Sequence, residues 1–141
     1  MDKITTNKII VEAKEKKKVV FLGGTCGTST WREELIPMLE IDYFDPVVDD
    51  WTPECQEEEI RQRQTCDEVL YVLTSQMEGV YSIAEVVDDS NKRPEKTVFC
   101  CLEDGFNEKQ IKSFKQVEKM VEENGAKVFS SLKQVADFLN G

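Results

Sequence analysis

The sequence predicts an α/β fold, a single doubly wound domain of the flavodoxin or Rossmann type with a five-stranded, mostly parallel sheet flanked by helices. Two observations support this prediction. Predicted strands at residues 18–22, 68–74 and 97–102 contain the apolar runs 19–22, 69–73 and 98–102, which are typical of strands that are buried on both faces. Helical patterns separate these runs, and short right-handed crossovers between such strands favour a parallel sheet with helices on both faces.

The first strand and the first helix are defined by an apolar run and the helical pattern after it. Residues 18–22 form a continuous apolar strand that two glycines close. Thr30 and Glu33 have the spacing of a capping box, which predicts a helix from residue 31 to about residue 39. Pro37 lies inside this stretch, so we expect a kink or an early end there.

The remaining elements continue the alternation of strands and helices. A short strand at 41–45 precedes a helix at 54–65, in which two glutamates stand four residues before arginines, the favourable order for ion pairs. These pairs are Glu57 with Arg61 and Glu59 with Arg63. After the third strand follow a helix around Glu85, a strand at 97–102, a helix at 108–124 ended by Gly125, a strand at 127–129 and a last helix capped by Ser131 with Gln134.

Length and composition restrict the organisation of the chain and its partners. The 141 residues fit a charged arm, residues 1–16, followed by one domain, residues 17–141. With 28 acidic and 18 basic residues the formal charge is −10, which argues against nucleic acid and anionic membranes as partners. No apolar run reaches the roughly 18 residues of a membrane span, and the first residues lack the apolar stretch of a secretory signal. We therefore expect a cytoplasmic protein that binds a small molecule.

The cysteine and histidine content limits the chemistry. The five cysteines are an odd number without a Cys-x-x-Cys pair, which argues against a disulfide framework and a zinc site. Cys100 and Cys101 are expected in the core, whereas Cys26 lies in a loop. The chain has no histidine, which removes Ser-His and Cys-His pairs and most transition-metal sites. We expect no metal or cofactor, and proton transfer by carboxylates, tyrosine, lysine or cysteine.

Three loops follow the carboxyl ends of the first three strands and are expected to share one cleft. The first, residues 23–30, offers backbone amides and hydroxyls at a helix N-terminus, although a tight glycine turn explains its sequence equally well. The second contains Asp49, Asp50 and Trp51, which can hydrogen-bond a base or sugar and stack on a ring. A polar loop with Trp51 anchored in the core is the alternative.

Glu85 is the candidate nucleophile. It is the one acid on an otherwise uncharged helical segment at residues 80–87. A carboxylate at such a cleft can form a covalent glycosyl intermediate when a second acid manages the proton. The alternative is a solvated surface residue, the usual state of a helical glutamate. The three glutamates at 57–59 are expected on a solvated helix face, unless one of them points inward beside Glu85.

These pieces occur in a characteristic order: Val-Phe-Leu-Gly-Gly, Trp-Arg-Glu-Glu-Leu-Ile, Phe-Asp-Pro with Asp-Asp-Trp, Cys-Asp-Glu-Val-Leu-Tyr-Val-Leu, and Ser-Ile-Ala-Glu-Val. Over residues 18–106 their order and spacing resemble the nucleoside 2-deoxyribosyltransferase-like family. The resemblance implies that Glu85 attacks the anomeric carbon and forms a deoxyribosyl-enzyme. It also implies a second acid, matched here by Glu59 in place of the usual aspartate, and homo-oligomers in which neighbouring subunits complete the pocket.

Two regions depart from the family pattern. Members often carry a tyrosine in the first strand or its loop that holds the nucleophile, whereas Phe21 and Thr25 occupy that region here, and Tyr81 is a candidate substitute. The glycine that commonly follows the nucleophile is replaced by Val86. Because of these departures, a non-catalytic module that binds a nucleoside or nucleotide is the alternative to an enzyme.

The leading hypothesis is transfer of deoxyribose from a 2'-deoxynucleoside, through a covalent intermediate, to a free base or to water. An aspartate of the second loop would protonate the leaving base or hold the sugar hydroxyls, and the tryptophan beside it would stack. Residues expected to act on the substrate are Glu85, Glu59 and Asp50, and those expected to bind it are Gly23, Gly24, Thr25, Asp49, Trp51 and Tyr81.

Two further ligand classes are less favoured. Only a few lysines and arginines lie near the predicted cleft, and Arg32 is the best placed of them, so a substrate that carries phosphate is an open but less favoured alternative. A receiver domain that accepts a phosphoryl group on Asp49 or Asp50 is weaker still, because these acids follow the second strand and no suitable lysine follows a later one.

Overall fold

Five parallel strands form one sheet in the computed structural model, which describes residues 17–141. The order in the sheet is β2-β1-β3-β4-β5, and all four neighbouring pairs are parallel. The predicted α/β fold is therefore confirmed, whereas the arm predicted for residues 1–16 lies outside the described residues. The strands are β1 (Val19–Gly24), β2 (Asp42–Phe44), β3 (Glu68–Leu73), β4 (Thr97–Cys101) and β5 (Lys127–Phe129).

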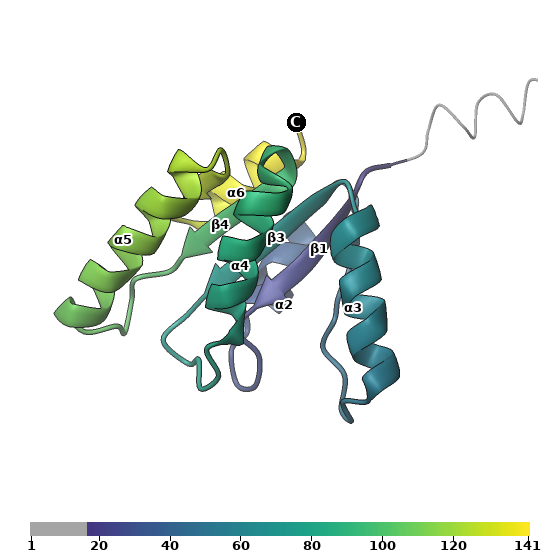
Figure 1. The fold of residues 1–141 in the computed structure, drawn as a ribbon, viewed down its shortest axis with the longest axis horizontal. Coiled ribbons are helices and arrows are strands. Elements are labelled where there is room, and N and C mark those ends of the chain that lie inside the picture. The colour runs from purple at the N-terminus through teal and green to yellow at the C-terminus, as the bar shows by residue number, and fades with distance from the viewer. Residues whose placement is uncertain (1–16) are drawn as a thin grey trace, which may run out of the picture.

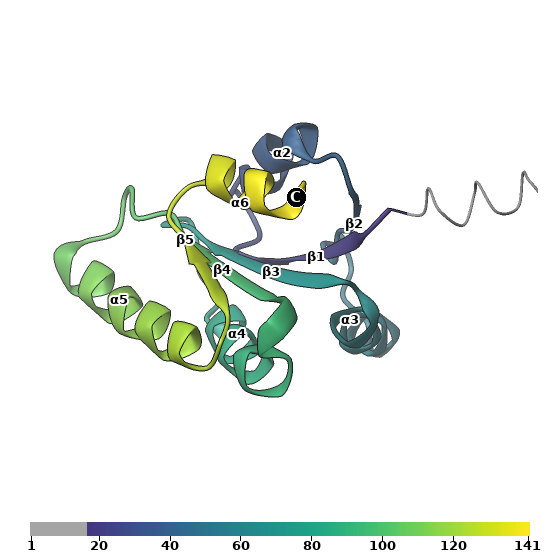
Figure 2. The same ribbon diagram turned by 90° about the horizontal axis from the view of Figure 1, so that it is seen from above.

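Helices cover both faces of the sheet (Figure 1). Figure 2, which looks along the sheet, shows how they divide between the two faces. None of the helices described in residues 17–141 is both long and apolar enough to cross a membrane. The pair on one face is α2 (Trp31–Leu35) and α6 (Leu132–Leu139), and those on the opposite face are α3 (Pro53–Thr65), α4 (Tyr81–Lys92) and α5 (Glu108–Glu123).

Successive side chains of the central strands form two separate hydrophobic cores, because they point to opposite faces of the sheet. Leu22 and Leu70 pack with Trp31 and the other apolar side chains of α2 and α6. Phe21 and Tyr71 belong to the opposite core, to which α4 and α5 contribute. The predicted cysteine positions are confirmed, since Cys100 and Cys101 are buried and Cys26 is exposed.

The strand order reverses between β1 and β3, which places a crevice beyond their carboxyl ends. The two strand ends lie very close together at Gly24. A Cβ atom at Gly24 would come within 2.0 Å of the Val72 carbonyl oxygen, and the residue has a φ of +123°. The next residue links the two loops, because Thr25 N donates to Val72 O at 2.9 Å and Thr25 Oγ1 accepts from Thr74 N at 2.9 Å.

Local signals predicted most helix ends correctly. Helix α2 ends at Leu35 and passes into a 3-10 turn that contains Pro37, as expected. Gly125 follows α5 with a φ of +112°, and the Ser131 side chain caps α6 by accepting from Gln134 N. The capping box at Thr30 was a wrong prediction. Thr30 has φ −107° and ψ 12° and makes no capping hydrogen bond within the described chain, because an N-cap side chain reaches the helix from an extended backbone.

Both ion pairs predicted along α3 were also wrong. Arg61 pairs with Glu58, one turn earlier at a spacing of three residues. Arg63 turns away from the helix surface toward acids of α4, one of which is fully buried. A buried carboxylate gains far more from a cation than a solvated glutamate does, so the tertiary partner prevails over the local one.

Candidate active site

The crevice beyond β1 and β3 contains a cavity of about 320 Å³, which we call the glycine-loop hollow. One wall is the loop after β1, where Gly24 and Thr25 lead into residues 26–28. The other wall is the loop after β3 together with Tyr81 and Ser82 at the start of α4. Backbone groups and hydroxyls therefore predominate on one side of this hollow, a surface suited to hydrogen bonding with a hydroxylated ligand.

A second cavity of about 230 Å³, the glutamate hollow, lies between α3 and the first turns of α4. Tyr81 lines both cavities, so the two hollows meet at its side chain. The glutamate hollow combines aromatic and ionisable groups in a small space. Its lining residues are Trp51, Gln56, Glu59, Ile60, Arg63, Tyr81 and Glu85.

Helix α4 positions Glu85 through the packing of its neighbours. Val86 and Asp89 are fully buried on the side of α4 that faces the sheet. Glu85 precedes this buried stripe and lies one turn before Asp89, so that both carboxylates project from the same side of the helix. The Glu85 side chain is 13% exposed, and its open side belongs to the glutamate hollow.

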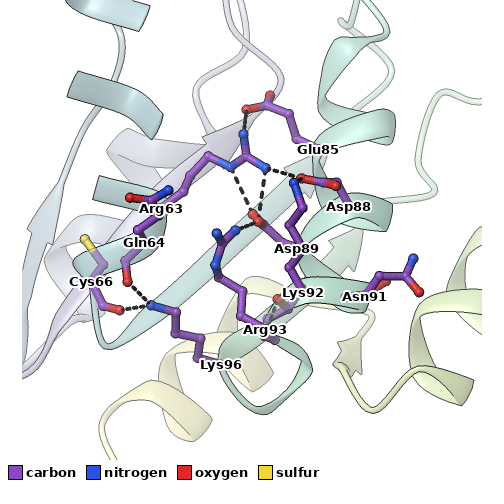
Figure 3. Close-up of polar contacts among 12 residues, drawn as sticks. Arg63, Gln64, Cys66, Glu85, Asp88, Asp89, Asn91, Lys92, Arg93 and Lys96 are labelled. Atoms are coloured by element: carbon purple, nitrogen blue, oxygen red, sulfur yellow. Dashed lines mark hydrogen bonds and ion pairs between the residues drawn. The ribbon is translucent and has the colours of Figure 1, made fainter. Parts of the chain in front are cut away.

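Arg63 of α3 connects these two carboxylates, as Figure 3 shows. Its Nε and Nη2 atoms donate to the two carboxylate oxygens of Asp89 at 3.1 and 3.0 Å. Nη2 also donates to Asp88 at 3.2 Å, and Nη1 lies 3.6 Å from Glu85 Oε2. A single guanidinium thus neutralises part of an acidic cluster that α4 presents toward α3.

Asp89 is the buried centre of this network. It accepts hydrogen bonds from Tyr71 of β3 and from Arg93 just beyond α4, in addition to those from Arg63. Burial would lower the pKa of Arg63, but the hydrogen bond and charge of Asp89 raise it above its ordinary value. Burial and the Asp89 charge raise the pKa of Tyr71, which therefore stays protonated and donates.

The acids of the glutamate hollow resist ionisation. Burial raises the pKa of Glu85 to about 7; the charge of Arg63 opposes this rise, whereas Glu59 and Asp89 add to it. Burial also raises the pKa of Glu59, again against the charge of Arg63. At neutral pH Glu85 is therefore present both as the carboxylate and as the acid. Groups balanced in this way suit nucleophilic or proton-transfer chemistry.

The structure brings several of the predicted site residues together. Glu85, Glu59 and Trp51 line the glutamate hollow, and Tyr81 lines both hollows. Trp51 is 59% exposed, so the alternative in which it is anchored in the core is wrong. Within residues 17–141, no cluster of three or more cysteine, aspartate or glutamate side chains is arranged to hold a metal ion.

Other predicted residues occupy different positions. Gly24 and Thr25 line the glycine-loop hollow. Gly23 is buried beneath it, where a Cβ atom would come within 2.7 Å of the Tyr71 ring. Asp49 and Asp50 are exposed and lie outside both hollows, in the loop before Trp51.

Arg32 is not the open cation that its sequence position suggested. Its guanidinium is buried, donates to the carbonyl oxygens of Leu22 and Thr25, and lies 4.3 Å from the centroid of the Trp31 ring. Its hydrogen bonds hold the start of the glycine loop against α2. The side chain is thus engaged in structural contacts, which weakens the case for a phosphate site built on it.

Sequence reasoning missed the roles of Arg63, Asp89 and Tyr71. One signal was present, because Asp89 follows Glu85 by four residues and therefore shares its helix face. Two acids on a face that packs against a sheet require a cation nearby. Arg63 met this requirement, but its spacing from Glu59 suggested a local pair instead.

A comparison with protein-family models supports the resemblance seen in the sequence. The model described as "nucleoside 2-deoxyribosyltransferase like" matches residues 17–105 of the chain. The matched stretch covers more than half of the chain and contains all the residues that line both hollows. No curated protein matches the chain. The match over this stretch shows that the chain belongs to the nucleoside 2-deoxyribosyltransferase-like family.

Proposed function

We propose that the protein cleaves the N-glycosidic bond of 2'-deoxynucleosides through a covalent intermediate on Glu85 and passes the deoxyribose to a free base or to water. The observation that carries this proposal is the nearly buried Glu85 carboxylate at the wall of the glutamate hollow, with a pKa of about 7, in a member of this family. Its ionised form is abundant at neutral pH and only weakly solvated, which favours attack on carbon.

The reaction has two displacement steps. In the first, a Glu85 oxygen forms a bond to the anomeric carbon while the bond between that carbon and the base nitrogen breaks, and the electron pair leaves with the base. In the second, a nitrogen of the acceptor base or a water oxygen attacks the same carbon, and Glu85 departs as a carboxylate. Because the donor base leaves before the acceptor reacts, the transferase would follow ping-pong kinetics.

The leaving base requires a proton. Glu59 is our main candidate for the donor, because it lines the same hollow as Glu85 and burial raises its pKa, which keeps more of it protonated. Asp50 is the second candidate, since it precedes Trp51 in the exposed loop beside the hollow. The acceptor step reverses the proton transfer, so that the same acid receives the proton that the acceptor loses.

The two hollows suggest how the substrate lies. If Glu85 attacks the anomeric carbon, the sugar sits near Tyr81, where the hollows meet, with its hydroxyls toward Gly24 and Thr25. The base then extends toward Trp51, whose exposed ring is free to stack. Because the Arg32 guanidinium is buried, we favour nucleosides over nucleotides as substrates.

We also propose that the protein associates with copies of itself. Exposed apolar side chains of Trp51, Ile60, Val80 and Tyr81 surround the hollows. Grouped apolar side chains of this kind are typical of a surface that another molecule covers. As the resemblance to the family implies, a neighbouring subunit would then close the open side of the pocket.

The decisive experiment compares wild type with Glu85→Gln on a panel of 2'-deoxynucleosides, with and without a second free base, by chromatography of bases and nucleosides. Glu95→Gln is the control, because Glu95 is an exposed glutamate just before β4, at the amino ends of the strands and thus opposite the crevice. Exchange that needs the second base and is lost in Glu85→Gln alone supports the transferase, and base release without an acceptor supports the hydrolase. If wild type and Glu85→Gln bind nucleosides equally well and neither reacts, the protein is a binding module and the proposal fails.

A further inference from the structure

We propose that Arg63 is a positioning residue, which holds Glu85 in its ionised form and in a fixed orientation, and that Asp89, Tyr71 and Arg93 in turn hold Arg63. This inference deepens the proposed function and rests on it for the role of Glu85. Its basis is the geometry of the guanidinium between α3 and α4 (Figure 3).

Two edges of the Arg63 guanidinium contact different carboxylates. The edge with Nε and Nη2 faces the Asp89 carboxylate, to which it donates at 3.1 and 3.0 Å. This two-point contact fixes the plane of the group, because rotation would break both hydrogen bonds. Nη1 is thereby directed toward Glu85, 3.6 Å from Oε2.

The partner that holds Arg63 is itself buried and fully hydrogen-bonded. Asp89 is 0% exposed and accepts hydrogen bonds from the Tyr71 hydroxyl and from Arg93 as well. Tyr71 is itself fully buried in β3. The sheet therefore fixes Asp89, Asp89 fixes Arg63, and Arg63 reaches the candidate nucleophile on α4.

The distance from Arg63 to Glu85 suits a nucleophile. At 3.6 Å the two charges attract strongly, yet the separation exceeds that of an ordinary hydrogen bond, so the carboxylate lone pairs are left free to attack. In the glycosyl-enzyme Glu85 becomes a neutral ester and the attraction disappears. Arg63 thus favours the return of the carboxylate, which assists departure of the sugar in the second step.

No other cation of the described chain forms an ion pair with Glu85. The other ionisable groups that face this region are Glu59 from α3, Tyr81, Asp88 and Asp89 from α4, and the Tyr71 hydroxyl from β3, with Arg93 bonded to Asp89. Of these acids, Glu59 and Asp89 disfavour a negative charge on Glu85. Arg63 is the group that opposes them, so its loss should make Glu85 harder to ionise.

The test compares Arg63→Met with Arg61→Met. Both arginines belong to α3, but Arg61 is exposed and pairs with Glu58 on the surface. The Glu85 carboxyl is titrated directly by NMR of protein labelled with 13C at the glutamate carboxyl, and its signal is assigned by its absence in Glu85→Gln. Because an adjacent arginine lowers a carboxyl pKa by about 1–3 units, we expect Arg63→Met to raise the Glu85 pKa by at least about one unit, and Arg61→Met to leave it unchanged.

Activity provides a second readout. A rise of the Glu85 pKa from about 7 by one unit lowers the ionised fraction at pH 7 about fivefold, so kcat/KM should fall by about that factor. The alkaline side of the pH profile should recover most of this loss, a pattern that simple damage to the fold does not produce. Arg63→Lys keeps the charge without the two-point contact, and we expect its Glu85 pKa to lie between those of wild type and Arg63→Met.

The titration separates the two proposals. An unchanged Glu85 pKa in a folded Arg63→Met protein overturns the role of Arg63, whatever the activity. If Arg63→Met does not fold, a Glu85 pKa in Arg63→Lys equal to that of wild type, with an unshifted pH profile, overturns it in the same way. A shifted pKa in a protein that never acts on nucleosides supports the control of Glu85 by Arg63 and contradicts only the proposed reaction.

Discussion

Substitution of Gly24 by alanine tests how closely β1 and β3 approach beneath the candidate site. The new Cβ would lie 2.0 Å from the Val72 carbonyl oxygen, so the strand ends must separate. A side chain at φ +123° costs about 1–2 kcal/mol, and overpacking a tight contact costs about 1–3 kcal/mol. The free energy of unfolding should therefore fall by roughly 2–5 kcal/mol, which for a chain of this size lowers the melting temperature by about 6–15 °C.

Two further glycines provide matched controls in thermal and urea unfolding. Gly27 has a φ of +78°, and a Cβ atom added there would have no neighbour within 4 Å, so Gly27→Ala should show the backbone strain alone. Gly79→Ala has neither strain nor a close contact and should unfold like wild type. The reasoning is refuted if Gly24→Ala and Gly27→Ala lose the same stability, because the contact with β3 would then contribute nothing.

Three other substitutions test the buried network and the exposed ring. Glu85→Gln should unfold at the same urea concentration as wild type at pH 4, but at pH 8 it should be more stable by on the order of 1–3 kcal/mol. The reason is that the Glu85 pKa is raised to about 7 in the folded protein, so wild type loses stability as pH rises from about 4.5 through 7. Asp89→Asn should lower the free energy of urea unfolding by about 3–5 kcal/mol, since two arginines lose a buried partner. Trp51→Ala should weaken nucleoside binding about tenfold or more in calorimetry, with little change in melting temperature, because stacking on a base contributes about 1–3 kcal/mol.

The fold could be predicted closely because its signals are local. Apolar runs mark the buried strands, and the last residues of these runs agree with the observed strand ends to within one or two positions, as at Glu68–Leu73. Glycine and proline marked several helix ends for reasons of backbone geometry alone. The capping box at Thr30 failed because its spacing was right but the φ and ψ angles of Thr30, which the preceding turn determines, were not.

The candidate site could be predicted only in part. A lone acid in an uncharged helical segment was visible in the sequence, and Glu85 does line a hollow. The contact between Arg63 and Asp89 spans 26 residues and depends on how α3 packs beside α4, which residue spacing does not encode. The same limit explains why Asp49 and Asp50 could be placed in the right loop but not relative to a cavity.

The position of Glu85 is difficult to explain by stability alone. The fold holds this carboxyl nearly buried, beside the carboxylates of Glu59 and Asp89, and its pKa of about 7 shows that ionisation is disfavoured in the folded chain. A neutral side chain of similar size would therefore stabilise the protein above neutral pH. The adjacent Arg63 restores part of the ionisation without satisfying Glu85 by an ordinary hydrogen bond. Glu85 thus destabilises the fold when ionised, its charge is partly compensated by Arg63, and it opens onto a hollow. These properties are expected of a group that reacts, rather than of one that supports the fold.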